Sequence, residues 1–221
     1  MTEPVYPDPV EAVVYALLSE KITERQAQAV WKRCQNHFLD LNDLRVARPD
    51  EIVEIYGKEN QDVRDVGTAL ASVLFSIFDK YHEMTLAPLQ KLGKRQVKQE
   101  LEGIKGISPF AVNYCLLTAF QAHAVPLTDK MILYLKDNDL VEPSADLNAI
   151  EGFLTKQISA KESFAFYTIL RTESEIAVKK TRKTTKKVTK KKTTRKTAAK
   201  KTTKKTTTQK KTTRKKTKRS R

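Results

Sequence analysis

The sequence is poor in cysteine, in histidine and in long apolar runs. Its 221 residues include two cysteines, Cys34 and Cys115, and three histidines, His37, His82 and His123, which are scattered without metal-ligand spacing. Two cysteines supply neither a disulfide framework nor the four thiolates of an iron–sulfur cluster. No apolar run reaches the roughly 18 residues of a membrane span, and the N-terminal letters MTEPVYPDP form no signal peptide. We therefore expect a soluble, cytoplasmic protein without a metal site or a membrane partner.

Acidic side chains are absent from the last 43 residues. Residues 179–221 hold 23 of the 42 Lys and Arg side chains and 15 threonines, which leaves residues 1–178 with a net charge of −7. Such a segment buries too little apolar surface to fold alone, so we expect a disordered tail behind a folded body at 1–178. It resembles the tails of linker histones, which implies binding to DNA phosphates by counterion release. RNA binding and a merely solubilising role are the alternatives.

The body reads as a series of helices with no alternating run long enough for a sheet. Apolar residues recur at helical spacing, and Asp, Ser, Thr and Pro stand where helices begin. This pattern predicts an all-α protein with helices at 9–19, 23–38, 43–46, 50–56, 62–81, 94–101, from 109, from 128 or 129 to 134, at 146–158 and at 161–177. In this reading Tyr15 and Trp31 occupy core positions and pack there.

One segment resembles a known DNA-binding turn. Residues 103–109 read GIKGISP and are similar to the hairpin of the helix-hairpin-helix DNA glycosylase superfamily, the endonuclease III-like (HhH-GPD) proteins. Lys105 stands at the family's usual proline and Ser108 at its second glycine. About twenty residues later, PLTDK at 126–130 resembles the family segment that carries the catalytic aspartate, and Asp129 falls on that position. The resemblance covers roughly residues 9–176.

The resemblance implies a two-lobed, all-α glycosylase fold in which a hairpin holds DNA near one carboxylate. Asp129 is then the catalytic residue, since a carboxylate stabilises the positive charge that develops on the sugar. The candidate DNA-binding residues are Lys21, Lys105, Gly106, Ile107, Ser108 and Lys130. A monovalent cation held by hairpin carbonyls is also implied by the family. The alternatives are an ordinary helix connection for the hairpin, a helix N-cap for Asp129 and an exposed surface lysine for Lys21.

Two departures from the family pattern bear on the chemistry. Phe110 stands where bifunctional members carry the Schiff-base lysine, so that chemistry is not available at this place. Its ring is a candidate for stacking on an everted base, and packing in the first helical turn is the alternative. The chain also runs from Arg171 into the basic tail without the family's cluster-binding loop, so an iron–sulfur cluster is not expected.

Together these features predict a DNA-binding, glycosylase-like protein of base-excision repair. If active, it is a monofunctional hydrolase of the N-glycosidic bond of a flipped, damaged base. The alternative is a non-catalytic DNA-architectural protein built from a degenerate glycosylase body and a histone-like tail. We expect a monomer that binds double-stranded DNA and associates with nucleoid or chromatin.

Overall fold

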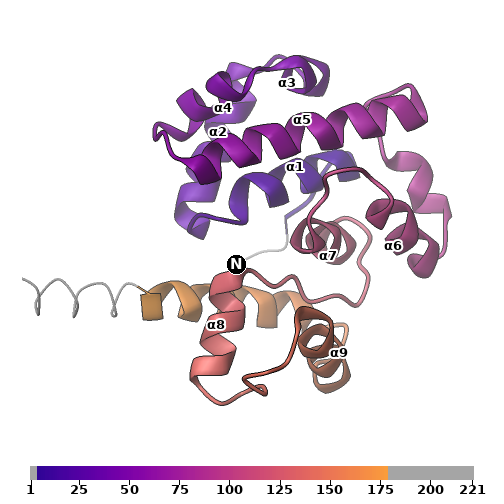
Figure 1. Ribbon diagram of the computed structural model, residues 1–221. Helices are drawn as coiled ribbons and strands as arrows, with labels where there is room; N and C mark the ends of the chain where they lie inside the picture. The colour runs from indigo at the N-terminus through magenta and orange to yellow at the C-terminus, as the bar shows by residue number, and fades with distance from the viewer. Residues whose placement is uncertain (1–3, 179–221) are drawn as a thin grey trace, which may run out of the picture. The chain divides into compact units, whose positions relative to one another are not determined.

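The computed structural model describes residues 4–178, and α-helices with short connections make up this part of the chain (Figure 1). No strand occurs within these residues, so the predicted all-α class is confirmed. The first of the two compact units ends at Glu175, and the description below concerns that unit. The disordered tail was predicted for residues 179–221, which lie outside the described residues.

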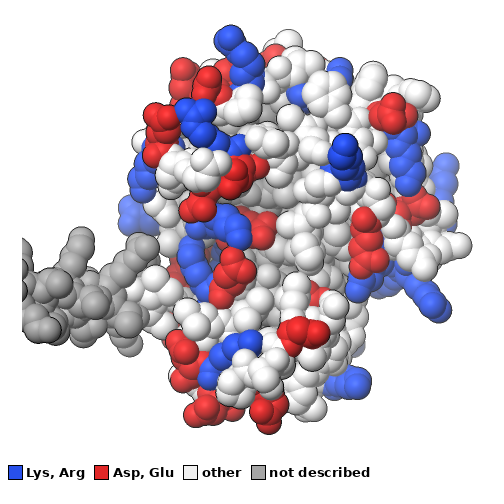
Figure 2. Space-filling view, viewed as in Figure 1, with Lys and Arg blue, Asp and Glu red and all other residues white. Residues whose placement is uncertain are grey.

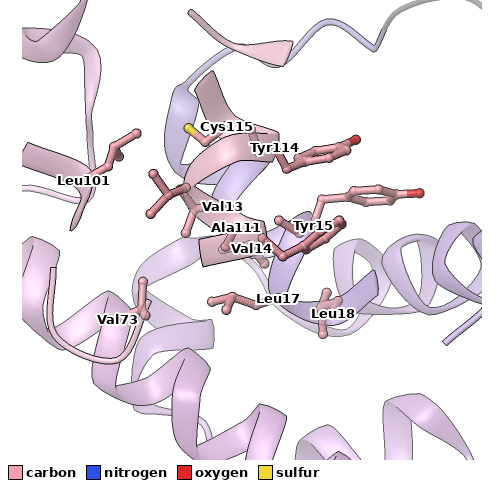
Figure 3. Packing of buried hydrophobic residues seen from close by; sticks show 14 of the residues in the cluster. Val13, Val14, Tyr15, Leu17, Leu18, Val73, Leu101, Ala111, Tyr114 and Cys115 are labelled. Atoms are coloured by element: carbon pink, nitrogen blue, oxygen red, sulfur yellow. The ribbon is translucent and has the colours of Figure 1, made fainter. Parts of the chain in front are cut away.

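Helix α1 (Pro9–Ser19) and helix α7 (Pro109–Thr118) form the centre of the fold. Each begins at a proline behind a capping side chain: Asp8 accepts from the Val10 N–H at 2.9 Å, and Ser108 accepts from the Ala111 N–H at 3.1 Å. Both helices are apolar around most of their circumference and are almost fully buried. Figure 3 shows side chains of α1 meeting those of α7, with the rings of Tyr15 and Tyr114 pointing to the same side.

Four helices cover one side of this pair: α2 (Glu24–His37), α3 (Leu41–Val46), α4 (Pro49–Tyr56) and α5 (Gln61–Tyr81). The α5 stripe predicted at helical spacing is buried at Val66, Leu70, Val73, Leu74 and Ile77. Gly57 ends α4 in the left-handed region at φ +64°, as its position after the apolar run predicted. The bounds of these helices agree with the predicted ranges to within a few residues.

A short 3₁₀ helix, η1 (Ala87–Lys91), precedes helix α6 (Lys94–Glu102) and was not predicted. Its five residues are too few to show a helical period in the sequence. Burial of Leu86 and Leu89 holds this turn against the core, which is a tertiary effect.

The second lobe contains helix α8 (Asp129–Asp137), helix α9 (Leu147–Gln157) and a last helix that begins at residue 163. Figure 1 shows these helices grouped on the side of α7 that faces away from α2–α5. The predicted two-lobed arrangement is therefore confirmed. The described part of the chain includes no helix long and apolar enough to cross a membrane.

Candidate functional site

The hairpin between α6 and α7 is pressed against α5. Gly106 has φ +88°, and a Cβ added there would lie 2.8 Å from the Ser72 Oγ. The Ser72 hydroxyl donates to the Lys105 carbonyl, and the Lys105 N–H donates to the Ser76 Oγ, both at 3.2 Å. Glycine is required here for two reasons, the left-handed backbone and the close approach of a neighbouring helix. The turn is thus held from behind by two serine hydroxyls.

The hairpin keeps main-chain donors free. Within the described residues, the N–H groups of Gly106 and Ser108 make no hydrogen bond. The N-terminus of α7 follows directly and adds the partial positive charge of its helix dipole. Free N–H groups at a helix N-terminus form an anion-binding arrangement that needs no cationic side chain. This geometry suits a phosphate group.

A short segment between α1 and α2 connects the hairpin to the second lobe. The Ser108 hydroxyl donates to the Glu20 Oε2 at 2.7 Å. Next in the chain, the Lys21 Nζ lies 3.8 Å from the Glu20 Oε1 and donates to the Asp129 Oδ2 at 2.8 Å. The Lys130 Nζ donates to the Lys21 carbonyl at 3.0 Å. The cap of α7 and the first turn of α8 are therefore joined through Glu20 and Lys21.

Asp129 is the first residue of α8, and its carboxylate is not the cap of that helix. The cap is Thr128, whose hydroxyl accepts from the Met131 N–H at 3.4 Å. The Asp129 side chain is 82% exposed. Its hydrogen bond with Lys21 raises the pKa of that lysine, so the amine stays protonated. An exposed ion pair of this kind contributes little free energy, so Lys21 can leave the carboxylate at small cost.

Arg171 fixes the segment that carries Lys21, and sequence reasoning gave it no role. Its side chain is 4% exposed, and its Nη2 donates to the Ser19 carbonyl at 2.8 Å and to the Ile22 carbonyl at 3.4 Å. Its Nε lies 3.0 Å from the Glu24 Oε2. The spacing of Arg171 and Glu175 on one helix face was the only signal in the sequence. Removal of a buried, paired arginine would leave carboxylates without a partner.

A cavity of about 590 Å³ lies beside Arg171. It is bordered by the N-terminal segment, α1, α2, α7 and the last helix, and its aromatic lining is Tyr6, Tyr15, Trp31, Tyr114, Phe164 and Tyr167. The interpretation of Tyr15 and Trp31 as core residues was therefore incomplete. Tyr15 is buried and Trp31 is half-buried, but both also face this cavity. Core and cavity-lining aromatics share the same helical spacing, so periodicity alone could not separate them.

Phe110 lies in the interior in this structure. Its side chain is 2% exposed, and its ring centroid is 6.0 Å from that of Tyr114 and 6.5 Å from that of Tyr167. The Arg171 guanidinium lies 5.7 Å from the ring centre. This placement agrees with packing in the first turn of α7. It leaves no face of the ring open for an everted base in this conformation, which corrects the stacking role considered for it.

Of the predicted site residues, Asp129, Lys21, Lys130 and Ser108 come together, and Lys105, Gly106 and Ile107 lie on the adjoining hairpin. Within residues 4–178, no group of His, Cys, Asp or Glu side chains has the arrangement of a metal site. Two hairpin carbonyls already accept hydrogen bonds, that of Lys105 from Ser72 and that of Ile104 from the Ile107 N–H. The monovalent cation implied for the hairpin stays a prediction.

Comparisons with known proteins find a similar fold but no significantly similar sequence. No family model matches the sequence, and no curated protein matches it significantly. Among solved structures, a trapped covalent endonuclease III–DNA intermediate shares 17% identity at a TM-score of 0.60, over 77% of this chain and 76% of that one. The chain has an endonuclease III-like glycosylase fold.

Other solved structures show the same fold. A non-covalent endonuclease III–DNA complex matches at TM-score 0.60 with 18% identity, over 77% of this chain and 75% of that one. The Clostridium acetobutylicum 8-oxoguanine glycosylase/lyase, in complex with double-stranded DNA, matches at TM-score 0.60 with 15% identity. That match covers 77% of this chain and 61% of the glycosylase/lyase, so a substantial part of that enzyme has no counterpart here. At these identities the likeness shows the fold.

Proposed function

We propose that the protein is a DNA-binding glycosylase of base-excision repair that hydrolyses the N-glycosidic bond of a flipped base. The observation that carries this proposal is the connection from Ser108 through Glu20 and Lys21 to Asp129. It places an exposed carboxylate next to a turn with free main-chain donors. The solved structures of similar fold were determined with DNA, which supports the choice of partner.

DNA binding by the body rests on the hairpin more than on a basic surface. Free N–H groups of Gly106 and Ser108 and the dipole of α7 attract one phosphate, and Lys105 and Lys130 add positive charge nearby. Figure 2 shows basic and acidic side chains interspersed on the face in view, without a large patch of one sign. The body's net charge of −7 repels a polyanion. The basic tail therefore supplies most of the nonspecific attraction and brings the protein to nucleoid or chromatin.

Asp129 is the catalytic residue of the proposed reaction. Breaking the glycosidic bond builds positive charge on the sugar, and a carboxylate beside it stabilises that charge and orients the attacking water. Lys21 is the residue that must move, because its ammonium group now neutralises Asp129. An incoming phosphate offers this lysine a second anionic partner. Phe110 has no amine for imine formation, so we propose base removal without strand scission.

One observation favours the alternative of a non-catalytic, DNA-architectural protein. The Lys21–Asp129 pair already satisfies the carboxylate, and a permanent pair would leave no free charge for the sugar. In that case the hairpin and the tail bind DNA and the body performs no chemistry.

The deciding experiment is a base-release assay on duplexes that carry a panel of oxidised, deaminated and alkylated bases. Wild type should release at least one base and leave an abasic site that breaks only after alkali or amine treatment. Asp129→Asn should lower the release rate by about 100-fold or more, because a charge-stabilising group is lost while DNA binding is kept. The control is Asp137→Asn, an exposed carboxylate at the other end of α8. Binding without release from any lesion supports the architectural alternative.

A further inference from the structure

The connection between α8 and α9 forms an apolar groove on the second lobe. The groove has a volume of about 540 Å³, and its apolar lining includes Leu140, Val141, Pro143, Ala149 and Phe153. Two of these side chains are large and exposed, Leu140 at 54% and Phe153 at 46%. Single exposed apolar residues are common on protein surfaces, whereas several gathered at one groove mark an interaction site.

Hydrogen bonds to α8 hold this connection in one conformation. Asp139 has a left-handed φ of +54° and turns the chain at the end of α8. The Leu140 N–H then donates to the Leu135 carbonyl at 3.0 Å, and the Lys136 Nζ donates to the Ala145 carbonyl at 2.8 Å. The connection is thus tied to α8 near both of its ends. A groove that exists before its partner arrives loses little conformational freedom on binding.

The charged residues of the groove are acidic. Within residues 4–178, they are Asp139 and Glu142, and neither carboxylate forms an ion pair. The ten residues after Lys136 include four acidic side chains and no Lys or Arg. Figure 2 shows acidic side chains along the lower edge of the molecule, where Figure 1 places this connection. Such a surface repels phosphate groups and attracts a cationic partner.

We infer that this groove docks a lysine- or arginine-rich segment of another protein through an aliphatic side chain. The aliphatic side chain packs on Leu140 and Phe153, and basic residues on either side of it meet Asp139 and Glu142. The apolar contact supplies most of the affinity, and the carboxylates select the sign of the partner's charge. Nucleic acids and anionic lipids have the wrong charge for this surface.

A partner in the groove leaves the candidate DNA site open. Helix α8 runs from Asp129 to Asp137, so the Lys21–Asp129 pair and the groove lie at opposite ends of a helix about 13 Å long. The hairpin lies at the Asp129 end, since Ser108 is connected to that end through Glu20 and Lys21. The protein can therefore hold a basic protein segment and a DNA duplex together. This inference does not require base release.

The test is a titration of full-length protein against three fluorescein-labelled peptides, followed by fluorescence anisotropy. The first peptide carries one leucine in the middle of a run of lysines. The second has serine in place of the leucine, and the third has glutamates in place of the lysines. We expect the lysine–leucine peptide to half-saturate at a concentration about tenfold lower than either control, because one leucine side chain is buried and the charges attract. Equal binding of the lysine–leucine and lysine–serine peptides overturns the inference.

Substitutions at exposed positions locate the effect. The double change Leu140→Ser and Phe153→Ser should remove the preference for leucine over serine while the helix content by circular dichroism stays that of wild type. The matched control is Ile169→Ser, which changes a 63% exposed side chain on the last helix, outside the groove. Glu142→Gln should weaken both lysine peptides, and Glu173→Gln, at an exposed position outside the groove, should not. A leucine preference that survives the double change overturns the inference.

Two other occupants of the groove give different results. Truncation after Val178 should change the binding of both lysine peptides alike. A leucine preference that is seen only after truncation means that the chain's own tail fills the groove. A dimer in size-exclusion chromatography that dissociates with Leu140→Ser means that a second copy fills it. Either of these two results overturns docking of a separate basic partner.

Discussion

Gly106 allows the backbone conformation of the hairpin that we propose binds DNA. Its left-handed φ of +88° brings the hairpin against α5, and the space for a side chain is taken by Ser72, whose Cβ would lie 3.0 Å from an added Cβ. We predict that Gly106→Ala lowers the free energy of unfolding by about 1–3 kcal/mol, because the left-handed backbone and the contact with Ser72 both become strained. Urea unfolding of the two proteins measures this difference.

The matched control is Gly152→Ala in the interior of α9. Nothing lies within 4 Å of a Cβ built there, so alanine should raise the free energy of unfolding by about 0.5–1 kcal/mol through its better helix propensity. If both alanine variants change stability in the same direction, the hairpin is not constrained as described.

Some of the site could be predicted from single residues and some could not. Gly106 and Asp129 were singled out because their segments, 103–109 and 126–130, resemble those of a glycosylase family, and the catalytic role of Asp129 stays a prediction. Glu20 and Arg171 were not found, because their partners Ser108 and Ser19 lie 88 and 152 residues away in the chain. Tyr15 and Trp31 were assigned to the core because a helical period reports burial on one face and does not report whether that face meets a cavity.

At the scale of elements, Ser108 caps helix α7 and also connects the hairpin to Glu20. The Ser108 side chain accepts from the Ala111 N–H and donates to Glu20. We predict that Ser108→Ala lowers the free energy of unfolding by about 1 kcal/mol. It should also slow base release severalfold, since the segment that carries Lys21 loses its tie to the hairpin. Thermal unfolding and single-turnover base release measure the two effects.

Asn60→Ala is the control for this prediction. Asn60 caps α5 by accepting from the Val63 N–H at 2.9 Å and takes no part in the site. It should cost about the same stability and leave the rate of base release unchanged. Equal slowing by both variants would mean that Ser108 acts only through stability.

Helix positions were the most predictable elements, since each long helix has an apolar stripe and a cap. Asp8, Ser108 and Asp146 were all recognised as residues at helix starts, and each accepts a hydrogen bond from its own first turn. The start of α8 was open between Thr128 and Asp129, because either residue can cap a helix. The structure assigns the cap to Thr128, and that leaves the Asp129 carboxylate outside the capping hydrogen bonds.

At the scale of the whole molecule, charge is divided between a body of net −7 and a tail with 23 basic side chains. We predict that truncation after Val178 weakens binding to undamaged duplex DNA by about 100-fold or more at low salt. The slope of log K against log salt should flatten, since each lost phosphate contact removes roughly 0.9 from it. Fluorescence anisotropy over a salt series measures both quantities.

A tail of the same composition in shuffled order tests whether charge alone is responsible. It should restore both affinity and slope, because phosphate contacts carry little sequence information. A shuffled tail that fails to restore binding, or a truncation that leaves affinity unchanged, would refute the role assigned to the tail.

The overall architecture could be predicted further than its 17% identity to an endonuclease III structure would indicate. The reason is that three features of this architecture can be recognised in a sequence. They are the glycine turn at 103–109, the carboxylate of Asp129 about twenty residues later, and the order of the helices. The packing of α1 against α7 depends on contacts between distant residues and became visible only in the structure (Figure 3).

The central claim is that the hairpin and the neighbouring Lys21–Asp129 pair form one site that binds DNA. Hydrogen–deuterium exchange of the full chain, with and without a duplex that contains a stable abasic-site analogue, tests it most directly. The account predicts slower exchange at residues 104–110, at 20–23 and at 128–131, with the backbone of α9 unchanged. Slower exchange confined to segments outside these three would contradict the account.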